Sequence, residues 1–355
     1  MTRPKGPPPP AHTITGFDIE RIEGGTLSTS LTLKDVARVA GVSPMTVSRA
    51  LHRPDLVKPE TIERVRKTVA RMGYIPNQLA GGLASRKTKL VAAIVPQVSN
   101  SIYIETIQGL IDRLWDNGYH VLLGLSGLSD TREDELTAAI LKRRPDGIML
   151  TGINHTSATR QRLLAASIPV VETWDLTPTP IDMLVGFSHE EAGRSIARYL
   201  LGKGYRRFGL VWAQNERSEL RRKGLIDELA RHGITDVPVD YSPAPSTLQL
   251  GRASTAVLLD QHRLDAIICS SDALAQGALA EALSRGLQIP AQLGVMGFGD
   301  LDFAAHTFPT LSSVKVDGRA IGIQAADALL NKMMGRPSPT RVFDVGFQII
   351  RRDSA

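Results

Sequence analysis

The chain of 355 residues carries a formal net charge of +6, and 42% of its residues are hydrophobic. These values are ordinary for a soluble globular protein, and the length allows two or three domains. The single cysteine, Cys269, excludes an internal disulfide and any metal site built from several cysteines. No apolar run approaches the roughly 20 residues of a membrane span, and the N-terminal residues lack the apolar region of a signal peptide, so we expect a cytoplasmic protein.

Residues 1–30 are rich in Pro, Gly, Ser and Thr and contain few large apolar side chains. A segment of this composition buries too little apolar surface to offset the entropy of ordering it. We therefore predict a disordered tail ahead of the folded part of the chain.

Residues 31–77 carry the pattern of three short helices. Thr32 is an N-cap candidate for the first helix, which ends at Gly41, a residue that tolerates a positive φ. Ser43 caps the second helix and places Pro44 at its first position, where a missing N–H costs nothing. Two helices joined by a short Gly-containing turn are typical of a helix-turn-helix, although a small bundle without nucleic acid shares this pattern.

Charge favours the DNA-binding alternative. Residues 31–88 contain 11 Lys and Arg against 4 Asp and Glu, whereas residues 1–30 are balanced and the remainder of the chain is nearly neutral. The predicted third helix, at about residues 59–72, contributes several of these cations beside an apolar face. Positive charge gathered in one small segment is what binding to phosphates requires.

Four motifs carry a resemblance that covers the chain after residue 30: TLKDVARVAGVSPMTVSRAL, GYIPNQLAGGLASRKT, ICSSDALAQGAL and GVMGFGDLDFA. They resemble the lactose-repressor family of bacterial transcription regulators. The resemblance implies an all-α helix-turn-helix domain at residues 31–77, followed by a hinge at residues 78–88. In the second helix we expect Pro44, Met45 and Arg49 at base edges, and Thr46 and Ser48 at phosphates. Together with the hinge leucine, the predicted DNA contacts are Thr32, Ser43, Pro44, Met45, Thr46, Ser48, Arg49, His52, Tyr74, Asn77 and Leu83.

The hinge resembles the family's short helix, which forms on DNA and inserts a leucine into the minor groove. By motif position this wedge is Leu83. The adjacent Gly81 and Gly82 each disfavour helix by about 1 kcal/mol relative to Ala, so we expect the hinge to be disordered off DNA.

Beyond residue 89 short apolar runs alternate with amphipathic helical segments, which predicts parallel α/β sheets. The stretch is long for one such sheet and fits two. The resemblance implies an effector-binding and dimerisation domain at residues 89–355, like periplasmic sugar-binding proteins, with two Rossmann-like lobes and an effector between them. We expect one lobe at about 89–188 and 316–344 and the other at about 189–315 and 345–355. The expected strands are 90–95, 120–125, 147–151, 169–172, 208–212, 266–269 and 294–298.

Loops at the carboxyl ends of these strands supply the candidate effector contacts. Arg221 occupies the arginine position with which the family holds its effector, and a guanidinium there grips a carboxylate or two sugar hydroxyls. Asp272 is equally well explained as the cap of the next helix. The predicted effector-binding residues are Ser101, Tyr103, Glu172, Trp174, Arg221, Ser271, Asp272 and Asp300.

Gly299 replaces an acid frequent in the family, and Arg217, Arg221 and Arg222 lie close together in sequence. Both features favour an acidic ligand, because a buried cation needs a partner. Segments such as PVVETWD and MLVGFSHEEAG most resemble the gluconate-utilisation and 2-ketogluconate-responsive repressors. We therefore predict a sugar-acid effector, with a neutral sugar or a purine corepressor as the alternatives.

No catalytic or metal-binding spacing is found, so we expect no enzyme and no cofactor. The predicted partners are double-stranded operator DNA, a small-molecule effector and a second copy of the chain, because a two-fold dimer matches a palindromic operator. Nothing in the sequence determines whether the effector is an inducer or a corepressor. A sugar-binding transport protein and a sugar-modifying enzyme are the rival classes, and the basic N-terminal segment argues against the first.

Overall fold

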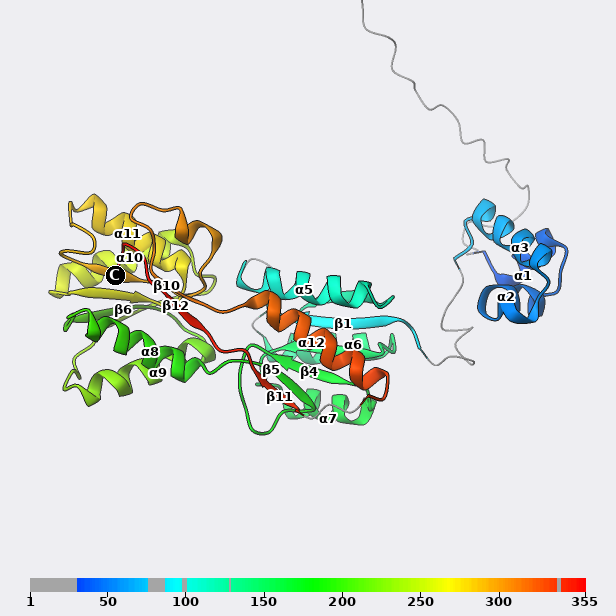
Figure 1. Ribbon diagram of the computed structural model, residues 1–355, viewed down its shortest axis with the longest axis horizontal. Coiled ribbons are helices and arrows are strands. Elements are labelled where there is room, and N and C mark those ends of the chain that lie inside the picture. The colour runs from blue at the N-terminus through cyan, green and yellow to red at the C-terminus, as the bar shows by residue number, and fades with distance from the viewer. Residues whose placement is uncertain (1–30, 76–86, 98–100, 128, 337–339) are drawn as a thin grey trace, which may run out of the picture. The chain divides into compact units, whose positions relative to one another are not determined.

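The computed structural model describes residues 31–75, 87–97, 101–127, 129–336 and 340–355, without the side chains of Ser101 and Asp130 (Figure 1). The chain divides into two compact units, Met1–Ala84 and Ser85–Ala355. The predicted tail at residues 1–30 lies outside the described residues, as does the predicted hinge up to residue 86, with Leu83 in it.

The first unit contains the three predicted helices. They are α1 (Leu33–Ala40), α2 (Pro44–His52) and α3 (Pro59–Met72), with a 3-10 turn, η1 (Pro54–Leu56), before the last. Thr32 and Asp35 form a reciprocal capping box at the start of α1, and Gly41 ends it with a φ of 66°. Apolar residues spaced three and four apart meet in a small core that includes Val36, Val47 and Val65. The structure confirms the helix-turn-helix prediction.

The second unit contains a six-stranded parallel sheet. Its strands lie in the order β11 (Val342–Asp344), β5 (Met183–Gly186), β4 (Val170–Thr173), β3 (Gly147–Thr151), β1 (Leu90–Val95) and β2 (His120–Leu125). One face packs on α5 (Ile104–Trp115) and α12 (Gly318–Met333), and the other on α6 (Asp130–Leu141) and α7 (Ser157–Ala166).

A second parallel sheet follows along the chain, in the order β7 (Val239–Ser242), β6 (Phe208–Ala213), β8 (Ala266–Cys269) and β9 (Gly294–Met296). Figure 1 shows α8 (His189–Gly202) and α9 (Glu216–Arg231) together on one face of this sheet, and α10 (Leu248–Gln261) and α11 (Asp272–Ser284) on the other. Strands buried on both faces explain the continuous apolar runs.

The remaining elements of this unit are short. Strands β10 (Ser313–Lys315) and β12 (Gln348–Ile350) form an antiparallel pair. Two 3-10 turns, η2 (Ser101–Tyr103) and η3 (Asp302–Ala305), lie in the loops after β1 and β9. No helix among the described residues is long and apolar enough to cross a membrane.

The predicted strands agree with the structure to within a few residues at their ends, but three strands of the two parallel sheets were not predicted. Strands β5, β7 and β11 are only three or four residues long, and β7 and β11 each contain an aspartate. A run this short carries little periodicity. Strand β2 differs in another way, because its apolar run lies at the sheet edge and leaves Leu123 40% exposed and Leu125 45% exposed.

Candidate functional site

The exposed face of α2 presents polar and apolar side chains without an acid. Met45 is 62% exposed, and Arg49 and His52 are also exposed. Ser43 caps the helix by accepting a hydrogen bond from the backbone N–H of Thr46 at 3.1 Å. The residues predicted to read DNA on α2 therefore lie on its accessible side, with Thr46 and Ser48 half-buried.

Two other residues predicted to contact DNA, Thr32 and Tyr74, are placed differently. Thr32 is exposed, but its hydroxyl also donates to the carboxylate of Asp35 at 2.6 Å, the same carboxylate that accepts from the N–H of Thr32. Tyr74 is only 8% exposed and belongs to the core of the unit, so most of its ring serves packing. Asn77, like Leu83, lies outside the described residues.

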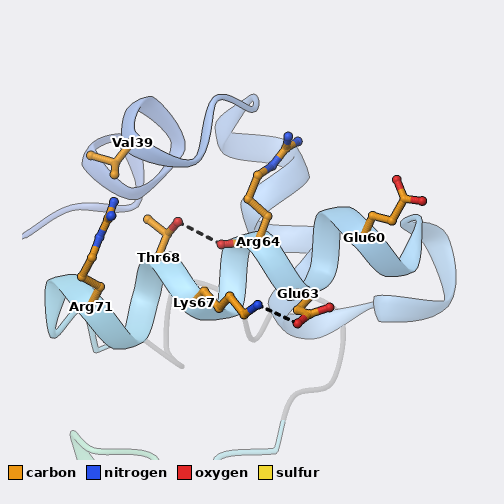
Figure 2. A pocket seen from close by; sticks show the side chains of 7 residues that line it. All are labelled: Val39, Glu60, Glu63, Arg64, Lys67, Thr68 and Arg71. Carbon is orange, nitrogen blue, oxygen red and sulfur yellow. Dashed lines mark hydrogen bonds and ion pairs between the residues drawn. The ribbon is translucent and has the colours of Figure 1, made fainter.

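A shallow groove between α1 and α3 contrasts with the α2 face. Figure 2 shows acidic and basic side chains of α3 side by side in it, with Lys67 paired to Glu63 at 2.8 Å. Thr68 is turned back on its own helix, where its hydroxyl donates to the carbonyl of Arg64 at 2.9 Å. Because its charges are mixed, this groove is less suited to a phosphate backbone than the acid-free face of α2.

In the second unit, Arg217 at the start of α9 reaches two residues in loops that follow strands of the six-stranded sheet. Its Nε donates to the carboxylate of Asp175, just beyond β4, at 2.8 Å, and its Nη1 donates to the hydroxyl of Tyr103 at 2.6 Å. Although burial opposes the shift, Tyr103 and Asp175 raise the pKa of Arg217 above its usual range. We call the surrounding group the arginine cluster; it comprises Tyr103, Trp174, Asp175, His189, Arg217 and Arg221.

Arg221, one helical turn after Arg217, is a buried cation whose hydrogen bonds go to neutral groups. Only 6% of the residue is exposed. It donates to Nδ1 of His189 at 3.0 Å and to the carbonyl of Ser270 at 3.1 Å, and its guanidinium lies 3.9 Å above the ring centre of Phe298. Its Nε–H has no hydrogen-bond partner among the described residues. Burial lowers the pKa of Arg221, and the positive charge of Arg217 adds to this effect.

His189 is held as a neutral imidazole in one tautomer. Since the guanidinium of Arg221 donates to Nδ1, the proton resides on Nε2, which lies 2.8 Å from the carbonyl oxygen of Trp174 and donates to it. Burial lowers the pKa of His189 well below 6.5, and the two arginines lower it further. His189 therefore adds no charge to the arginine cluster.

Trp174 adopts a left-handed backbone conformation, with a φ of 75°, where β4 ends. Its N–H donates to Val185 at 3.0 Å, its indole N–H donates to Thr106 at 3.2 Å, and its ring packs edge-on against Tyr103. A non-glycine residue at such a φ costs on the order of 1–3 kcal/mol and persists only when its surroundings enforce it. The strained turn directs the next residue, Asp175, toward Arg217.

Helices α8 and α9 approach each other through two glycines. A Cβ atom at Gly193 would overlap the carbonyl oxygen of Arg221, and one at Gly224 would overlap the carbonyl oxygen of Glu190. The contact therefore requires the absence of side chains at both positions. This close packing determines where the backbone of Arg221 lies relative to α8.

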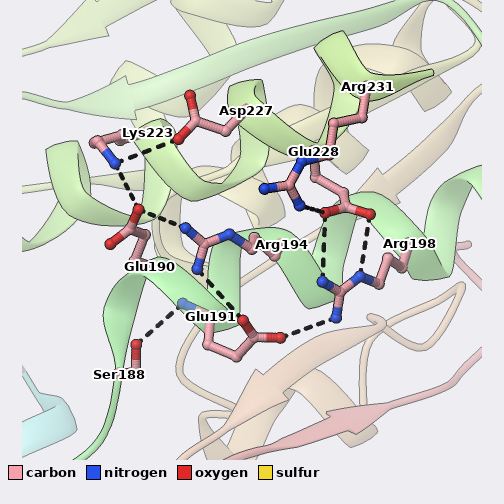
Figure 3. A network of polar contacts seen from close by, with 9 residues as sticks. All are labelled: Ser188, Glu190, Glu191, Arg194, Arg198, Lys223, Asp227, Glu228 and Arg231. Carbon is pink, nitrogen blue, oxygen red and sulfur yellow. Dashed lines mark hydrogen bonds and ion pairs between the residues drawn. The ribbon is translucent and has the colours of Figure 1, made fainter.

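Charged side chains line the solvent side of the same two helices (Figure 3). Arg198 of α8 pairs with Glu228 of α9 at 3.1 Å, and Lys223 of α9 pairs with Glu190 of α8. Arg194 joins this network through Glu190 and Glu191 of its own helix. Exposed pairs each contribute little, but a network of this kind favours one alignment of the two helices.

The predicted residues Asp272 and Asp300 lie in a separate polar group. One carboxylate oxygen of Asp272 accepts from Ser313 at 2.6 Å and the other from the N–H of Leu301 at 2.7 Å. Burial raises the pKa of Asp272 to about 6. Asp300 pairs with Arg352 at 2.7 Å. Both oxygens of Asp272 are thus used within the protein, but not to cap α11: Asp272 is the first residue of that helix, and Ser271 is its cap.

Glu172 makes its polar contacts away from the two arginines. It is fully buried, accepts from the N–H of Ile181 at 2.6 Å, and lies 3.6 Å from Nε2 of His155. His155 is bonded in turn to Glu133 at 2.6 Å. Burial raises the pKa of Glu172. These contacts tie the loop after β3 to α6 and β4, which is a structural arrangement.

Of the predicted effector contacts, the structure brings Tyr103, Trp174 and Arg221 together. Ser271 caps α11 by accepting from Leu274 at 3.4 Å, and the side chain of Ser101 is not described. Sequence reasoning missed His189 and Asp175, and it noted Arg217 only as one of several neighbouring arginines. The signal available for Asp175 was its position directly after a strand, at the carboxyl edge where ligands bind in α/β sheets.

Two family models match the chain. Residues 32–77 match "Bacterial regulatory proteins, lacI family", and residues 197–355 match "Periplasmic binding protein-like domain". The chain is 37% identical to the HTH-type transcriptional regulator GntR of Pseudomonas aeruginosa, over 91% of this chain and 95% of the relative. It is 31% identical to the HTH-type transcriptional regulator IdnR of Escherichia coli, over 90% and 97%. A solved LacI family regulator from Silicibacter pomeroyi superposes with a TM-score of 0.86 at 33% identity, over 91% and 99%.

Proposed function

Because this chain belongs to the lacI family of bacterial regulatory proteins and is a DNA-binding transcriptional regulator rather than an enzyme, we propose that it represses genes for the use of a sugar acid. In this proposal the sugar acid, of the gluconate or 2-ketogluconate type, binds at the arginine cluster. Its binding releases the protein from a palindromic operator.

The observation that carries the proposal is that Arg221, a buried cation, has no acidic hydrogen-bond partner among the described residues. A buried cation with neutral partners and an unpaired N–H is unfavourable unless a ligand supplies an anion and an acceptor. A carboxylate does both, and a guanidinium binds it in two-point geometry. The hydroxyl of Tyr103, within the cluster, is suited to sugar hydroxyls.

The sequence adds independent support for an acidic ligand. Gly299 stands where relatives frequently carry an acid, so one negative charge that would repel a carboxylate is absent. The segments PVVETWD and MLVGFSHEEAG resemble those of gluconate-type repressors, and the first of them holds Asp175 of the cluster.

The proposed release mechanism is a shift between two states of the effector domain. We assign one lobe to residues 89–188 and 316–344, the other to residues 189–315 and 345–355, and the hinge to residues 78–88. An effector that binds one lobe arrangement more tightly shifts the population toward it and disfavours the DNA-bound hinge. The contact between Arg217 and Asp175 joins residues of the two proposed lobes, so it is sensitive to their arrangement.

We propose that the protein acts in the cytoplasm as a homodimer. The edge strand β2 leaves Leu123 40% exposed and Leu125 45% exposed, and the neighbouring end of α5 leaves Trp115 64% exposed. An exposed apolar patch at a sheet edge is a candidate for pairing with a second copy. A symmetric dimer would present two α2 helices to the two halves of a palindrome.

The test is a gel-shift assay on the DNA upstream of the neighbouring operon, with and without gluconate, 2-ketogluconate, glucose, ribose and hypoxanthine. Retarded DNA that only the acids release supports the proposal. If only a neutral sugar releases the DNA, or if hypoxanthine tightens DNA binding, the effector is that ligand and not a sugar acid. Absence of DNA binding at moderate salt overturns the operator proposal as a whole.

A pair of variants separates DNA binding from effector binding. Leu83→Ala, in the predicted hinge, should weaken operator binding and leave effector binding near that of the parent. Arg221→Ala should do the reverse. Equal loss of both activities in both variants would contradict the division of roles.

A further inference from the structure

The arginine cluster contains two arginines, and they differ in whether a carboxylate is hydrogen-bonded to the guanidinium group. Arg217 is neutralised by Asp175 at 2.8 Å, with Tyr103 as a second partner at 2.6 Å. Among the described residues, Arg221 donates to two neutral groups, the imidazole of His189 and the carbonyl of Ser270. Since His189 is a neutral imidazole, the cluster as a whole carries one net positive charge.

The single carboxylate is itself firmly held. Asp175 is buried, with its side chain 5% exposed, and its second oxygen lies 3.4 Å from Nε2 of His189. The backbone carbonyl of Asp175 lies where any side chain on Gly186 would stand, so the segment has little room to move. Asp175 therefore remains against Arg217 as a fixed negative charge near the proposed ligand position.

Neighbouring charges do not alter this balance. Asp300 is paired with Arg352, and Glu219 with Arg222 on the outer side of α9. Glu216 keeps its negative charge, because its partner Asn154 is neutral, but it is exposed, so solvent screens that charge. A ligand with one negative charge would leave the cluster neutral, whereas a second charge would face Asp175 without a free cation.

We propose that Asp175, through its ion pair with Arg217, restricts the effector to a singly charged sugar acid and excludes dicarboxylates. The inference rests on the proposed sugar-acid function and names the residue that sets the charge of the ligand. Asp175 acts as a specificity-determining residue because it occupies the one arginine that a second carboxylate would need.

The experiment measures dissociation constants of the full-length protein by calorimetry for gluconate, glucarate and glucose, which carry one, two and no negative charges. The parent is expected to bind gluconate at least about tenfold more tightly than either of the others. Asp175→Asn frees Arg217 and raises the net charge of the cluster, so it should shift the glucarate-to-gluconate preference by on the order of tenfold toward glucarate.

Two further variants distinguish an effect of charge on ligand choice from a general loss of folding. Arg217→Gln leaves Asp175 without its cation, so glucarate affinity should fall more than gluconate affinity; an equal fall would point to a merely structural role and overturn the proposal. The double variant Asp175→Asn with Arg217→Gln keeps one net positive charge and should return the ligand ranking to that of the parent. Asp327→Asn, which removes a carboxylate from an exposed pair with Arg113, is the matched control and should leave all three affinities unchanged.

The outcomes distinguish this inference from the proposed function. If glucose binds the parent as tightly as gluconate, the sugar-acid function is wrong. If glucarate binds the parent more tightly than gluconate, the acidic effector stands and the role of Asp175 is wrong. An unchanged ranking in Asp175→Asn also overturns the inference.

Discussion

Arg221 and His189 form a donor–acceptor pair in which the cation is the donor and the imidazole stays neutral, with 3.0 Å between Nη1 and Nδ1. Neither this pair nor the bond to the carbonyl of Ser270 supplies a negative charge to Arg221. This arrangement suits a site whose negative charge arrives with the ligand, and it leads to the first two predictions.

Replacement of Arg221 should separate ligand binding from stability. Arg221→Gln is expected to weaken sugar-acid binding by about a hundredfold, because a charge-assisted contact is lost. The free energy of unfolding without ligand should stay within about 1 kcal/mol of the parent, since an uncompensated buried charge is removed together with its hydrogen bonds. Calorimetry and urea unfolding measure the two effects. Arg222→Gln, which removes an adjacent arginine paired with Glu219, is the control and should retain ligand binding.

The neutral state of His189 predicts a dependence of stability on pH. Its folded pKa lies well below the unfolded value of 6.5, so below pH 6.5 the unfolded chain takes up a proton that the folded protein does not. The stability contribution of His189 is therefore present above pH 6.5 and is lost as pH falls, by up to about 1.4 kcal/mol per pH unit.

The measurement is urea unfolding between pH 7.5 and 5, for the parent and for His189→Gln, whose amide can accept from Arg221 and donate to Trp174. The variant should lose less stability over this range. Asp272 acts in the opposite direction, because its pKa is raised to about 6, so the difference between the two proteins isolates His189. Parallel curves would contradict the assignment of a neutral imidazole.

The contact of α8 with α9 predicts that replacing two glycines of α8 by alanine has very different effects on stability. Gly193→Ala forces a methyl group against the backbone carbonyl of Arg221, so it should cost about 1–3 kcal/mol and lower effector affinity by displacing that residue. Gly202→Ala, at the end of α8 with open space around it, should be neutral or stabilising by up to about 1 kcal/mol. Thermal unfolding of both variants checks this, and equal effects would contradict the packing argument.

On the DNA-binding unit, Arg49 of α2 and Arg64 of α3 are both exposed, but only α2 is predicted to read bases. We therefore expect different roles for the two arginines in DNA binding. Arg49→Ala should weaken operator binding by about 1–3 kcal/mol, because it removes the predicted contact to a base edge. Arg64→Ala removes the same charge from α3, beside the groove in Figure 2, and should change operator affinity much less. Fluorescence anisotropy with operator and with unrelated DNA measures both. Similar losses for the two variants would indicate a purely electrostatic contribution.

The sequence was sufficient for the elements whose signals are local. The caps Thr32 and Ser43 and the turn residue Gly41 predicted α1 and α2, and their geometry is as expected. Arg221 was found because its motif is recognisable. The apolar runs predicted the longer parallel strands because a strand buried on both faces needs no alternation.

The rest depends on contacts between residues far apart in the chain. Asp175 and Arg217 are separated by 42 positions, and His189 and Arg221 by 32, so no window of sequence shows that they meet. The positive φ of Trp174 cannot be predicted from the sequence either, because a tryptophan disfavours that conformation and only the surrounding hydrogen bonds enforce it. Glu172 was a plausible ligand contact, but one of its carboxylate oxygens accepts from Ile181, and the other lies 3.6 Å from His155 without a hydrogen bond among the described residues.

The hydrogen bond from His189 to the carbonyl of Trp174 also bears on the proposed effector site. Burial and the two arginines lower the pKa of His189, so the imidazole beside Arg221 stays neutral at a pH where an exposed histidine takes up a proton. Under the proposed function, the charge that this site presents to a sugar acid would therefore be the same in a mildly acidified cell as in a neutral one.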